Sequence, residues 1–304
     1  MTLAAGVTVA IAATVGGEAP RAQPSRAGRT TPAITAAPLE APGAATQSQL
    51  GPWHLVGHDA QPGLVSDEGV TTTDTSPSVV YRGVLSILPE VGLQGWVHIG
   101  DPDSWRGAIV DAYQGAPGAT SKLFVVTLPD GTRHSYTHAL DRGELLNNSF
   151  AAVSPDGQWL VSGEFGVADR LLVFPLPGAN PARSAADGTL ARVGNIALDH
   201  QVSDVQGCDF VTPTRLLCAT DDPGTALWPT DRQLLQVDLP APLSGRTTTG
   251  HVRDLGPLPQ QSVCQGTFET EGIDYDLRTG ILRAEVVPPP PCDSITTVYE
   301  YRSA

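Results

Sequence analysis

The stretch Glu271-Gly-Ile-Asp-Tyr-Asp-Leu-Arg-Thr-Gly-Ile-Leu-Arg-Ala-Glu-Val286 decides the fold, because it predicts a strand, a tight turn and a second strand. The turn falls at Arg278-Thr279-Gly280. The same unit recurs at residues 150–163 and at residues 208–220. A unit that repeats along a chain indicates an array of small sheets.

A polar residue stands just before the first strand of each unit, in most cases followed by glycine. In chain order the four dipeptides are Glu68-Gly69, Asn148-Ser149, Gln206-Gly207 and Glu271-Gly272. This regular placement raises the question of whether the polar side chains form a site or serve only as a repeated structural device.

Further β-type runs follow each hairpin and bring the count to about four strands per unit. The units begin near residues 68, 96, 148, 206 and 271, and the spacing brackets that of propeller blades, about 40 to 50 residues. We therefore predict an all-β chain with a single β-propeller of about five blades. A sixth blade follows if residues 241–259 form another short sheet.

The last unit has only three evident strands, and residues 53–56 can supply its fourth. Pairing of the N-terminal and C-terminal strands would then close the ring and remove its exposed sheet edges. Long helices are not expected, because the 32 Gly and 27 Pro of the 304 residues interrupt every long amphipathic run.

The formal net charge of −14 argues against nucleic acid and anionic membranes as partners, since both repel an acidic protein. Residues 3–16 form an apolar run, and Gly17-Glu18-Ala19 offers a cleavage point, as in a signal peptide. A small-residue tail without a targeting role is the alternative. We interpret residues 1–50 as this signal-like segment and a disordered tether rich in Ala, Pro and Thr, and residues 51–304 as the propeller. No transmembrane segment is expected in the mature chain, and we predict a secreted, extracellular protein.

All four cysteines lie in the last third of the chain, which in an exported protein favours disulfides. Three pairings are open. Cys208 and Cys218 flank a strand, turn, strand pattern that can bring them to neighbouring positions, so we predict that pair together with Cys264 and Cys292. The spacing does not suit a zinc site.

The sequence Val153-Ser-Pro-Asp-Gly-Gln-Trp-Leu160 resembles the strand and turn signature of TolB-type and YVTN-type propellers. Three further motifs resemble the blade starts of exported propellers in the SdiA-regulated, phytase-like or gluconolactonase-like group. They are Val65-Ser-Asp-Glu-Gly-Val70, His98-Ile-Gly-Asp101 and Glu271-Gly-Ile-Asp274. The resemblance implies a central channel that holds a divalent cation. Glu68 and Asn148 match the glutamate and asparagine ligands of gluconolactonase-like members in residue type and placement.

Residues just before the first strand of a blade face the channel in a propeller, so Glu68, Asn148, Gln206 and Glu271 are predicted to converge. Their carboxylate and amide oxygens suit calcium, which is the cofactor that we expect if a metal is bound. The alternative is that each side chain only hydrogen-bonds to its own turn or to the neighbouring blade.

Three more residues are candidates for the channel or its mouth: His98, Asp101 and Asp103. Asp101 and Asp103 can place two carboxylates near a cation, or lie in a solvated turn. His98 can act as a ligand or base, or pack in the core.

Two functions from different classes follow. The first is a non-enzymatic exported scaffold that binds a peptide, glycan or small ligand at the channel mouth, where loops gather on a rigid frame. The second is a metal-assisted hydrolase of lactones or phosphate esters. No motif for a catalytic nucleophile is present. We prefer the scaffold, and the partner is an unknown small molecule, glycan or protein.

Overall fold

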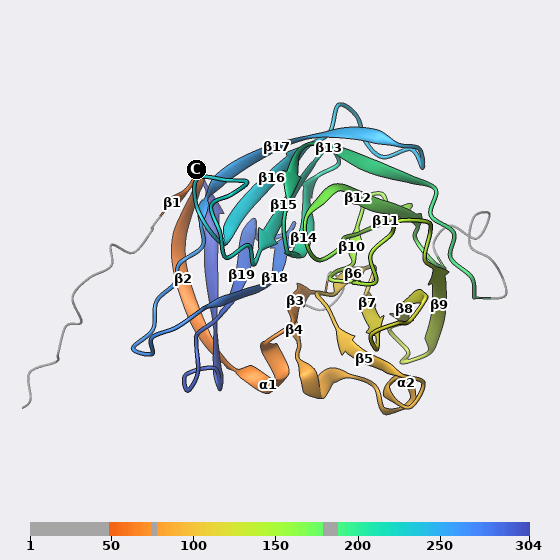
Figure 1. Cartoon of the computed structure of the whole chain (residues 1–304), viewed down its shortest axis with the longest axis horizontal. Coiled ribbons are helices and arrows are strands. Elements are labelled where there is room, and N and C mark those ends of the chain that lie inside the picture. The colour runs from red at the N-terminus through yellow and green to blue at the C-terminus, as the bar shows by residue number, and fades with distance from the viewer. Residues whose placement is uncertain (1–48, 74–77, 179–187) are drawn as a thin grey trace, which may run out of the picture. The chain divides into compact units, whose positions relative to one another are not determined.

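The computed structural model describes residues 49–73, 78–178 and 188–304, all of which belong to the unit that runs from Ala41 to Ala304. Within this unit nearly all elements are strands, and they form blade sheets around a common axis (Figure 1). The predicted β-propeller with five blades is confirmed. Of the predicted signal-like segment and tether, residues 1–48 lie outside the described residues.

Blade 1 is the smallest, because it has two antiparallel strands and short helices where the other blades have outer strands. Pro89 stands at the start of the second α-helix, a position that suits its fixed φ and missing N–H. The elements of this region are α1 Gly63–Ser66, β3 Gly69–Thr72, β4 Val79–Arg82, η1 Val84–Ser86 and α2 Pro89–Gly92.

Blade 2 has an interrupted inner strand. Its β5 Trp96–Ile99 and β6 Asp103–Trp105 both pair with β7 Ala108–Gly115, and β8 Ser121–Thr127 and β9 Arg133–Ala139 follow. Pro102 lies in the interruption and has no N–H to donate. Asp101 instead pairs with the next blade, since its N–H donates to Ser149 O and its carbonyl accepts from Ala151 N, both at 2.9 Å.

Blades 3 and 4 join into one eight-stranded sheet through their outermost strands, β13 and β17, which pair in parallel. The expected alternative of a sixth blade in residues 241–259 is therefore not realised, because β17 is the outer strand of blade 4. Blade 3 contains β10 Ala152–Val153, β11 Trp159–Ser162, β12 Ala168–Pro175 and β13 Gly194–Val202. Blade 4 contains β14 Val205–Thr212, β15 Arg215–Thr220, β16 Gln233–Asp238 and β17 Thr248–Pro257.

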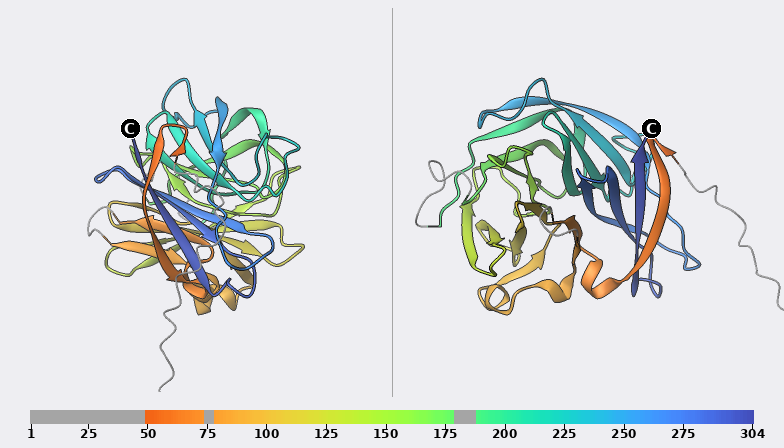
Figure 2. Two further views of the ribbon diagram at one scale, coloured as in Figure 1. Left: turned by 90° about the vertical axis from the view of Figure 1, so that its left-hand side faces the viewer. Right: turned by 180° about the vertical axis from the view of Figure 1, so that it is seen from behind.

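Blade 5 closes the ring with strands from both ends of the unit. Its C-terminal strands are β18 Glu269–Asp276, β19 Ile281–Val287 and β20 Ile295–Ser303. The fourth strand is β2 Trp53–Pro62, which pairs with β20 along its whole length and carries the short β1 Gln49–Leu50 on its other edge. Figure 2 shows β2 and β20 side by side. The predicted closure by the segment near Trp53 is confirmed.

The hydrophobic core lies between successive blades. Between blades 2 and 3, for example, Phe124 and Phe174 are completely buried, with ring centroids 5.4 Å apart. Burying a side chain of this kind contributes about 1.5–3 kcal/mol. Because neighbouring blades cover both faces of the middle strands, β12 has a continuous buried run from Leu171 to Pro175 in place of alternation.

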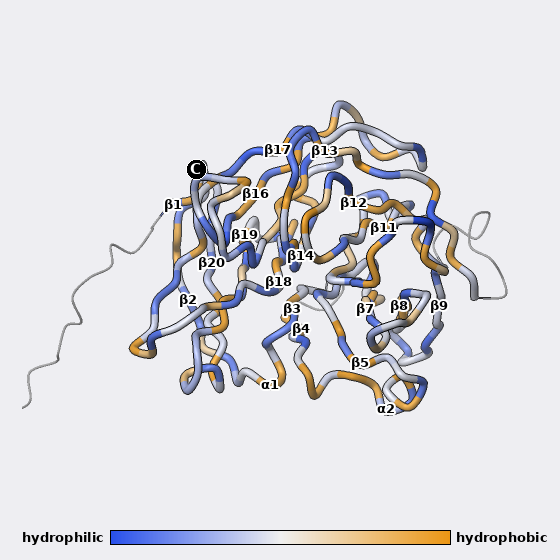
Figure 3. Tube along the Cα trace, viewed as in Figure 1, coloured by the Kyte–Doolittle hydropathy of each residue, from blue (hydrophilic) through white to orange (hydrophobic). Residues whose placement is uncertain are grey.

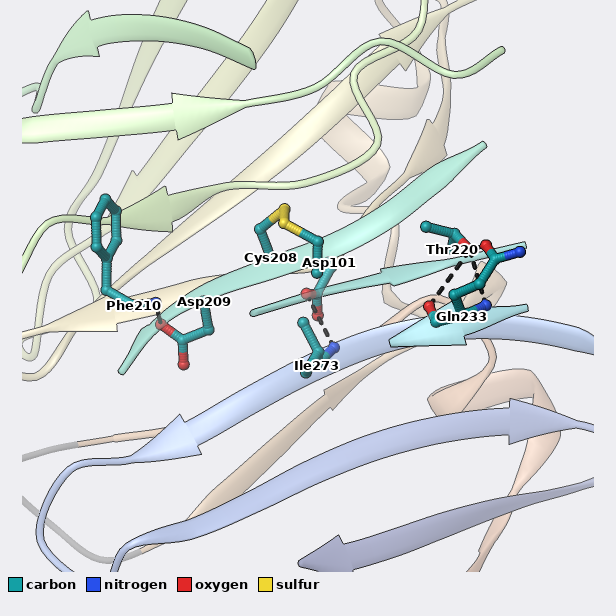
Figure 4. Close-up of a disulfide and its surroundings, with 8 residues drawn as sticks. Asp101, Cys208, Asp209, Phe210, Thr220, Gln233 and Ile273 are labelled. Carbon is teal, nitrogen blue, oxygen red and sulfur yellow. Dashed lines mark hydrogen bonds between the residues drawn. A yellow bond between two sulfur atoms is a disulfide. The ribbon is translucent and has the colours of Figure 1, made fainter. Parts of the chain in front are cut away.

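Both predicted disulfides are present. Cys208 and Cys218 are directly opposite each other on β14 and β15, with Cα atoms 4.0 Å apart. Cys264 and Cys292 connect the segment before β18 to the loop before β20, with Cα atoms 6.0 Å apart. Figure 4 shows the first bridge close to Asp101 at the inner edge of the blades.

Among the residues that the structure describes, none of the helices has the length and apolar character needed to span a bilayer.

Candidate functional site

The glycines that follow the predicted polar residues meet at Asp101. A Cβ atom added to Gly69, Gly207 or Gly272 would collide with atoms of Asp101. Three blades therefore need glycine at this level, because the side chain of Asp101 from blade 2 occupies the space between them. This close approach explains the glycines. Gln206 and Glu271 were expected just before their strands but lie within β14 and β18, whereas Glu68 does directly precede β3.

Asp101 is fully buried and connects three blades. Its Oδ1 accepts a hydrogen bond from Val70 N at 2.9 Å, and its Oδ2 accepts one from Ile273 N at 3.1 Å (Figure 4). Burial raises the pKa of Asp101 well above its usual range, and these hydrogen bonds only partly oppose the effect. Asp101, predicted as a channel or mouth residue, thus lies at the level of the three glycines with no exposed surface.

The residues just before the glycines line one polar cavity of about 390 Å³, which we call the acidic cavity. Glu68, Gln206 and Glu271 contribute to it from blades 1, 4 and 5, as does His98 from β5. Its carboxylates are Asp67, Glu68, Asp221, Glu269, Glu271 and Asp293. Among the cavity-lining residues, His98 is the sole basic side chain, so the lining carries a strong negative charge.

Glu271 is the deepest of these carboxylates and has no counter-charge. Only 7% of the residue is exposed, and its side chain has no hydrogen-bond or ion-pair partner among the described residues. Burial raises the pKa of Glu271 well above its usual range, and the charges of Glu68, Asp221 and Glu269 raise it further. A carboxylate in this state favours an added proton or cation.

Glu68 and His98 form a pair at the cavity wall, with His98 Nε2 2.9 Å from Glu68 Oε2. Burial raises the pKa of Glu68, although the hydrogen bond from His98 opposes this shift. Burial would lower the pKa of His98, but the hydrogen bond and charge of Glu68 outweigh it, so the pKa of His98 is raised. Because His98 is its partner, the charge of Glu68 is better compensated than that of Glu271.

Asp221 is the cavity carboxylate with an arginine behind it. Arg232 Nε lies 3.1 Å from Asp221 Oδ1 and also donates to Phe268 O at 2.7 Å. Burial still raises the pKa of Asp221 to about 6. Glu285, completely buried on β19, has a pKa raised well above its usual range by burial and next by the charge of Asp101.

Asn148, predicted as the fourth member of the ring, does not line the acidic cavity and needs a correction. Its Nδ2 donates to Tyr113 O and Leu123 O at 3.3 and 3.0 Å, and its Oδ1 accepts from Ser162 Oγ at 2.8 Å. These bonds connect blade 2 to blade 3. The amide therefore has the inter-blade role that the alternative interpretation expected for such residues.

Asp103 lies at the other end of the inner strands, beside a second cavity of about 370 Å³. Its Oδ2 accepts from Val153 N of blade 3 at 2.6 Å. Two acids that sequence reasoning missed make similar bridges: Asp209 accepts from Tyr275 N at 2.6 Å, and Asp274 accepts from Thr72 N at 2.8 Å. The sequence spacing could have indicated these acids. Asp209 and Asp274 each follow a glycine that packs against Asp101 by two residues, and Asp103 follows Asp101 itself by two.

The acids of the acidic cavity are spaced more widely than a tight metal site requires. Among the described residues, the group whose three ligand atoms lie within 4.8 Å of one another is His138, Asp141 and Glu144. There, Glu144 already contacts Lys122 Nζ and His138 Nε2, both at 3.0 Å, so its charge is neutralised. The acidic cavity keeps its uncompensated charge.

No protein-family model matches the chain, and no curated protein matches it. The structure is similar to that of a gluconolactonase from Xanthomonas campestris, with 15% sequence identity, a TM-score of 0.35 and coverage of 67% of this chain and 57% of that chain. It is also similar to Kluyveromyces lactis Hsv2, with 18% identity, a TM-score of 0.29 and coverage of 52% and 47%. The structure is also similar to the native arabinanase Arb43A of Bacillus subtilis, with 11% identity, a TM-score of 0.40 and coverage of 84% of this chain and 95% of that chain.

The chain thus spans 57% of the gluconolactonase and 47% of Hsv2. The propeller assignment rests on the strand pairing described above.

Proposed function

We propose that this propeller binds calcium in the acidic cavity and that the mouth of the cavity binds a peptide, glycan or small ligand without catalysis. Glu271 supports the proposal most strongly, because it is a buried carboxylate that lines the cavity and has no partner in the part of the chain that the structure describes. Burying a carboxylate is costly unless it is paired or neutralised. A bound cation would supply the missing charge.

The donor atoms fit calcium. Glu68 and Glu271 offer carboxylate oxygens and Gln206 offers an amide oxygen, which are the hard ligands that calcium accepts in flexible geometry. Zinc and magnesium require more regular coordination than calcium. Calcium also needs its oxygen ligands at about 2.3–2.6 Å, so the cavity carboxylates would have to approach one another when the ion binds. The other carboxylates around the cavity would attract the ion from solution.

We propose further that the protein is exported. Both disulfides support this location, since such bonds persist in oxidising compartments. Extracellular calcium would be available to the site there.

A thermal-melting experiment tests the calcium proposal. Calcium should raise the melting temperature of the wild-type protein, because an ion that binds only the folded state stabilises it. The gain should shrink in Glu271→Gln, which keeps the shape of the side chain but removes its charge. Glu90→Gln is the matched control, since Glu90 is exposed and pairs with Arg133 away from the cavity. If calcium does not change the melting temperature of the wild-type protein, the proposal of a metal site fails.

The pair of His98 and Glu68 favours a second candidate, a metal-assisted hydrolase of lactones or phosphate esters. Calcium would supply polarisation of a carbonyl or phosphoryl oxygen. His98 would accept a proton from the attacking water, and Glu68 would orient the imidazole. His98→Gln should then reduce turnover of a simple lactone or of 4-nitrophenyl phosphate by about 100-fold. If the calcium-loaded wild type hydrolyses neither compound, this candidate is rejected and the binding function stands.

A further inference from the structure

Exposed apolar side chains stand at the rim of the acidic cavity. Leu64 from α1 is 58% exposed, and Phe165 from the loop between β11 and β12 is 36% exposed, yet both line the cavity. The two residues belong to blades 1 and 3, so apolar surface is present on different sides of one acidic opening. Large exposed apolar side chains that gather around a polar site are typical of binding surfaces.

The apolar surface extends beyond these two residues. α1 packs on η1, since a Cβ at Gly83 would meet the backbone of Leu64. Further exposed apolar side chains lie on α1 and η1 and near Phe165. The hydropathy colouring of Figure 3 shows hydrophobic residues, in orange, at α1. The further exposed side chains are Val65, Val84 and Leu85 on α1 and η1, and Leu145 and Val167, which line a separate cavity of about 210 Å³.

The architecture explains why the apolar residues of α1 and η1 are exposed. Blade 1 has two strands, and the short segments α1 and η1 lie where other blades have outer strands that would cover apolar side chains. Single exposed apolar side chains are common on protein surfaces, but several of them around one opening mark a site of interaction. A partner that covers them would gain about 25 cal/mol per Å² of apolar area removed from water.

The charge of the mouth specifies the partner's chemistry. Glu269 and Asp293 are exposed cavity acids, whereas Glu271 lies deeper. A cation held at Glu271 would leave these outer carboxylates free to attract a basic group. Anionic lipid surfaces and nucleic acids would be repelled by the same charges.

We propose that the mouth of the acidic cavity docks an extended segment of a partner protein, in which an arginine or lysine meets the outer carboxylates and flanking apolar side chains cover Leu64 and Phe165. This inference rests on the proposed function only in taking this mouth as the ligand site. It names the partner as a basic and apolar peptide, and it does not depend on calcium.

Fluorescence anisotropy with labelled peptides tests the inference. The probes are the pentapeptide Leu-Phe-Arg-Phe-Leu and its counterpart with glutamate in the centre, each measured with calcium and with EDTA. The arginine peptide should bind at least about tenfold more tightly than the glutamate peptide. Its affinity should also fall as salt is added, since screening weakens exposed charge pairs. Equal affinities, or no binding of the arginine peptide, would overturn the inference.

A matched pair of variants locates the binding. Leu64→Ser combined with Phe165→Ser should weaken the arginine peptide by about tenfold, because both substitutions remove apolar contacts. Leu277→Ser is the control, since Leu277 is 61% exposed and lines the second cavity instead. An equal effect of the control would contradict docking at this mouth. Calcium-dependent melting of the same variants separates the proposals, because its absence in the wild type rejects the calcium site whether or not the peptide binds.

Discussion

Asp101 Oδ2 accepts a hydrogen bond from the backbone N–H of Ile273 at 3.1 Å, across 172 positions of the chain. The bond joins blade 2 to blade 5, which are not neighbours in the ring, so Asp101 stabilises the inner ends of the blades directly. The three glycines around it give its side chain the necessary space.

Replacing Asp101 should therefore be costly. Asp101→Ala leaves the N–H groups of Val70 and Ile273 without acceptors, and each buried donor of this kind costs about 1–3 kcal/mol. Asp101→Asn should cost less than Asp101→Ala, because the amide oxygen keeps one of the two acceptors, although its NH2 group cannot accept from the second N–H. Urea unfolding measures both. Equal stability of Asp101→Ala and the wild type would show that the bridge does not hold the ring together.

The metal-free protein should lose stability as the pH rises from about 4 to 7. Asp221, with a pKa of about 6, and Glu271, whose pKa is also raised, bind protons in the folded state at pH values where the unfolded chain has released them. The free energy of unfolding therefore falls as the pH rises through this window. Glu144 has the opposite effect, because its pKa in the folded state is only about 2. Its contribution raises the free energy of unfolding as the pH rises, but only at pH values below this window.

Unfolding in urea with EDTA at several pH values checks this dependence. Glu271→Gln should flatten the profile, because the variant has no proton to lose at this position. A metal-free wild type whose stability rises between about pH 4 and pH 7 would contradict the assigned burial of these acids.

The buried pair of Lys122 and Glu144 should tolerate the loss of either partner poorly. Both side chains are fully buried and 3.0 Å apart. Burial opposes ionisation of Glu144, but the hydrogen bond from His138 and the charge of Lys122 outweigh it and lower the pKa of Glu144 to about 2. Lys122→Met would remove one of these partners and should destabilise the protein by about 3–5 kcal/mol.

The matched control for that variant is Arg133→Met, which breaks the exposed pair with Glu90 and should cost no more than about 1 kcal/mol. Chemical denaturation compares the two. Similar losses in both variants would mean that the lysine is not buried with its glutamate.

The disulfide between Cys264 and Cys292 should stabilise the protein by about 2–4 kcal/mol, since it restricts the unfolded chain. Replacing both cysteines by serine should lower the denaturant midpoint accordingly. Peptide mapping without reduction should recover Cys264 linked to Cys292 in the wild type. A peptide that links Cys208 to Cys264 would show that the pairing is wrong.

The blade order could be predicted because its signals are local. Strand, turn, strand patterns and the turn residues around Gly157 and Gly280 mark the hairpins without reference to distant contacts. The closing strand at Trp53 could also be predicted, because the last unit lacked one strand and an open ring would expose its edges.

The candidate site was predictable only in part. Glu68, Gln206 and Glu271 line one cavity because each precedes a glycine that packs against Asp101. Asn148 has a similar position in the sequence, but β10 of blade 3 begins only at Ala152, so its side chain reaches blade 2 instead.

The remaining cavity acids come from loops and strand ends in different blades. Asp221 follows β15, Glu269 begins β18 and Asp293 lies before β20. Their convergence depends on how the ring closes, which no local pattern in the sequence encodes.

Calorimetric titration of calcium into the wild type, Glu271→Gln and Glu90→Gln tests the central claim most directly. We predict a single site in the wild type, the same site in Glu90→Gln, and an affinity at least about tenfold weaker in Glu271→Gln, because a direct charged ligand is lost. Indistinguishable titrations of the wild type and Glu271→Gln, or no heat of binding in the wild type, would contradict the account.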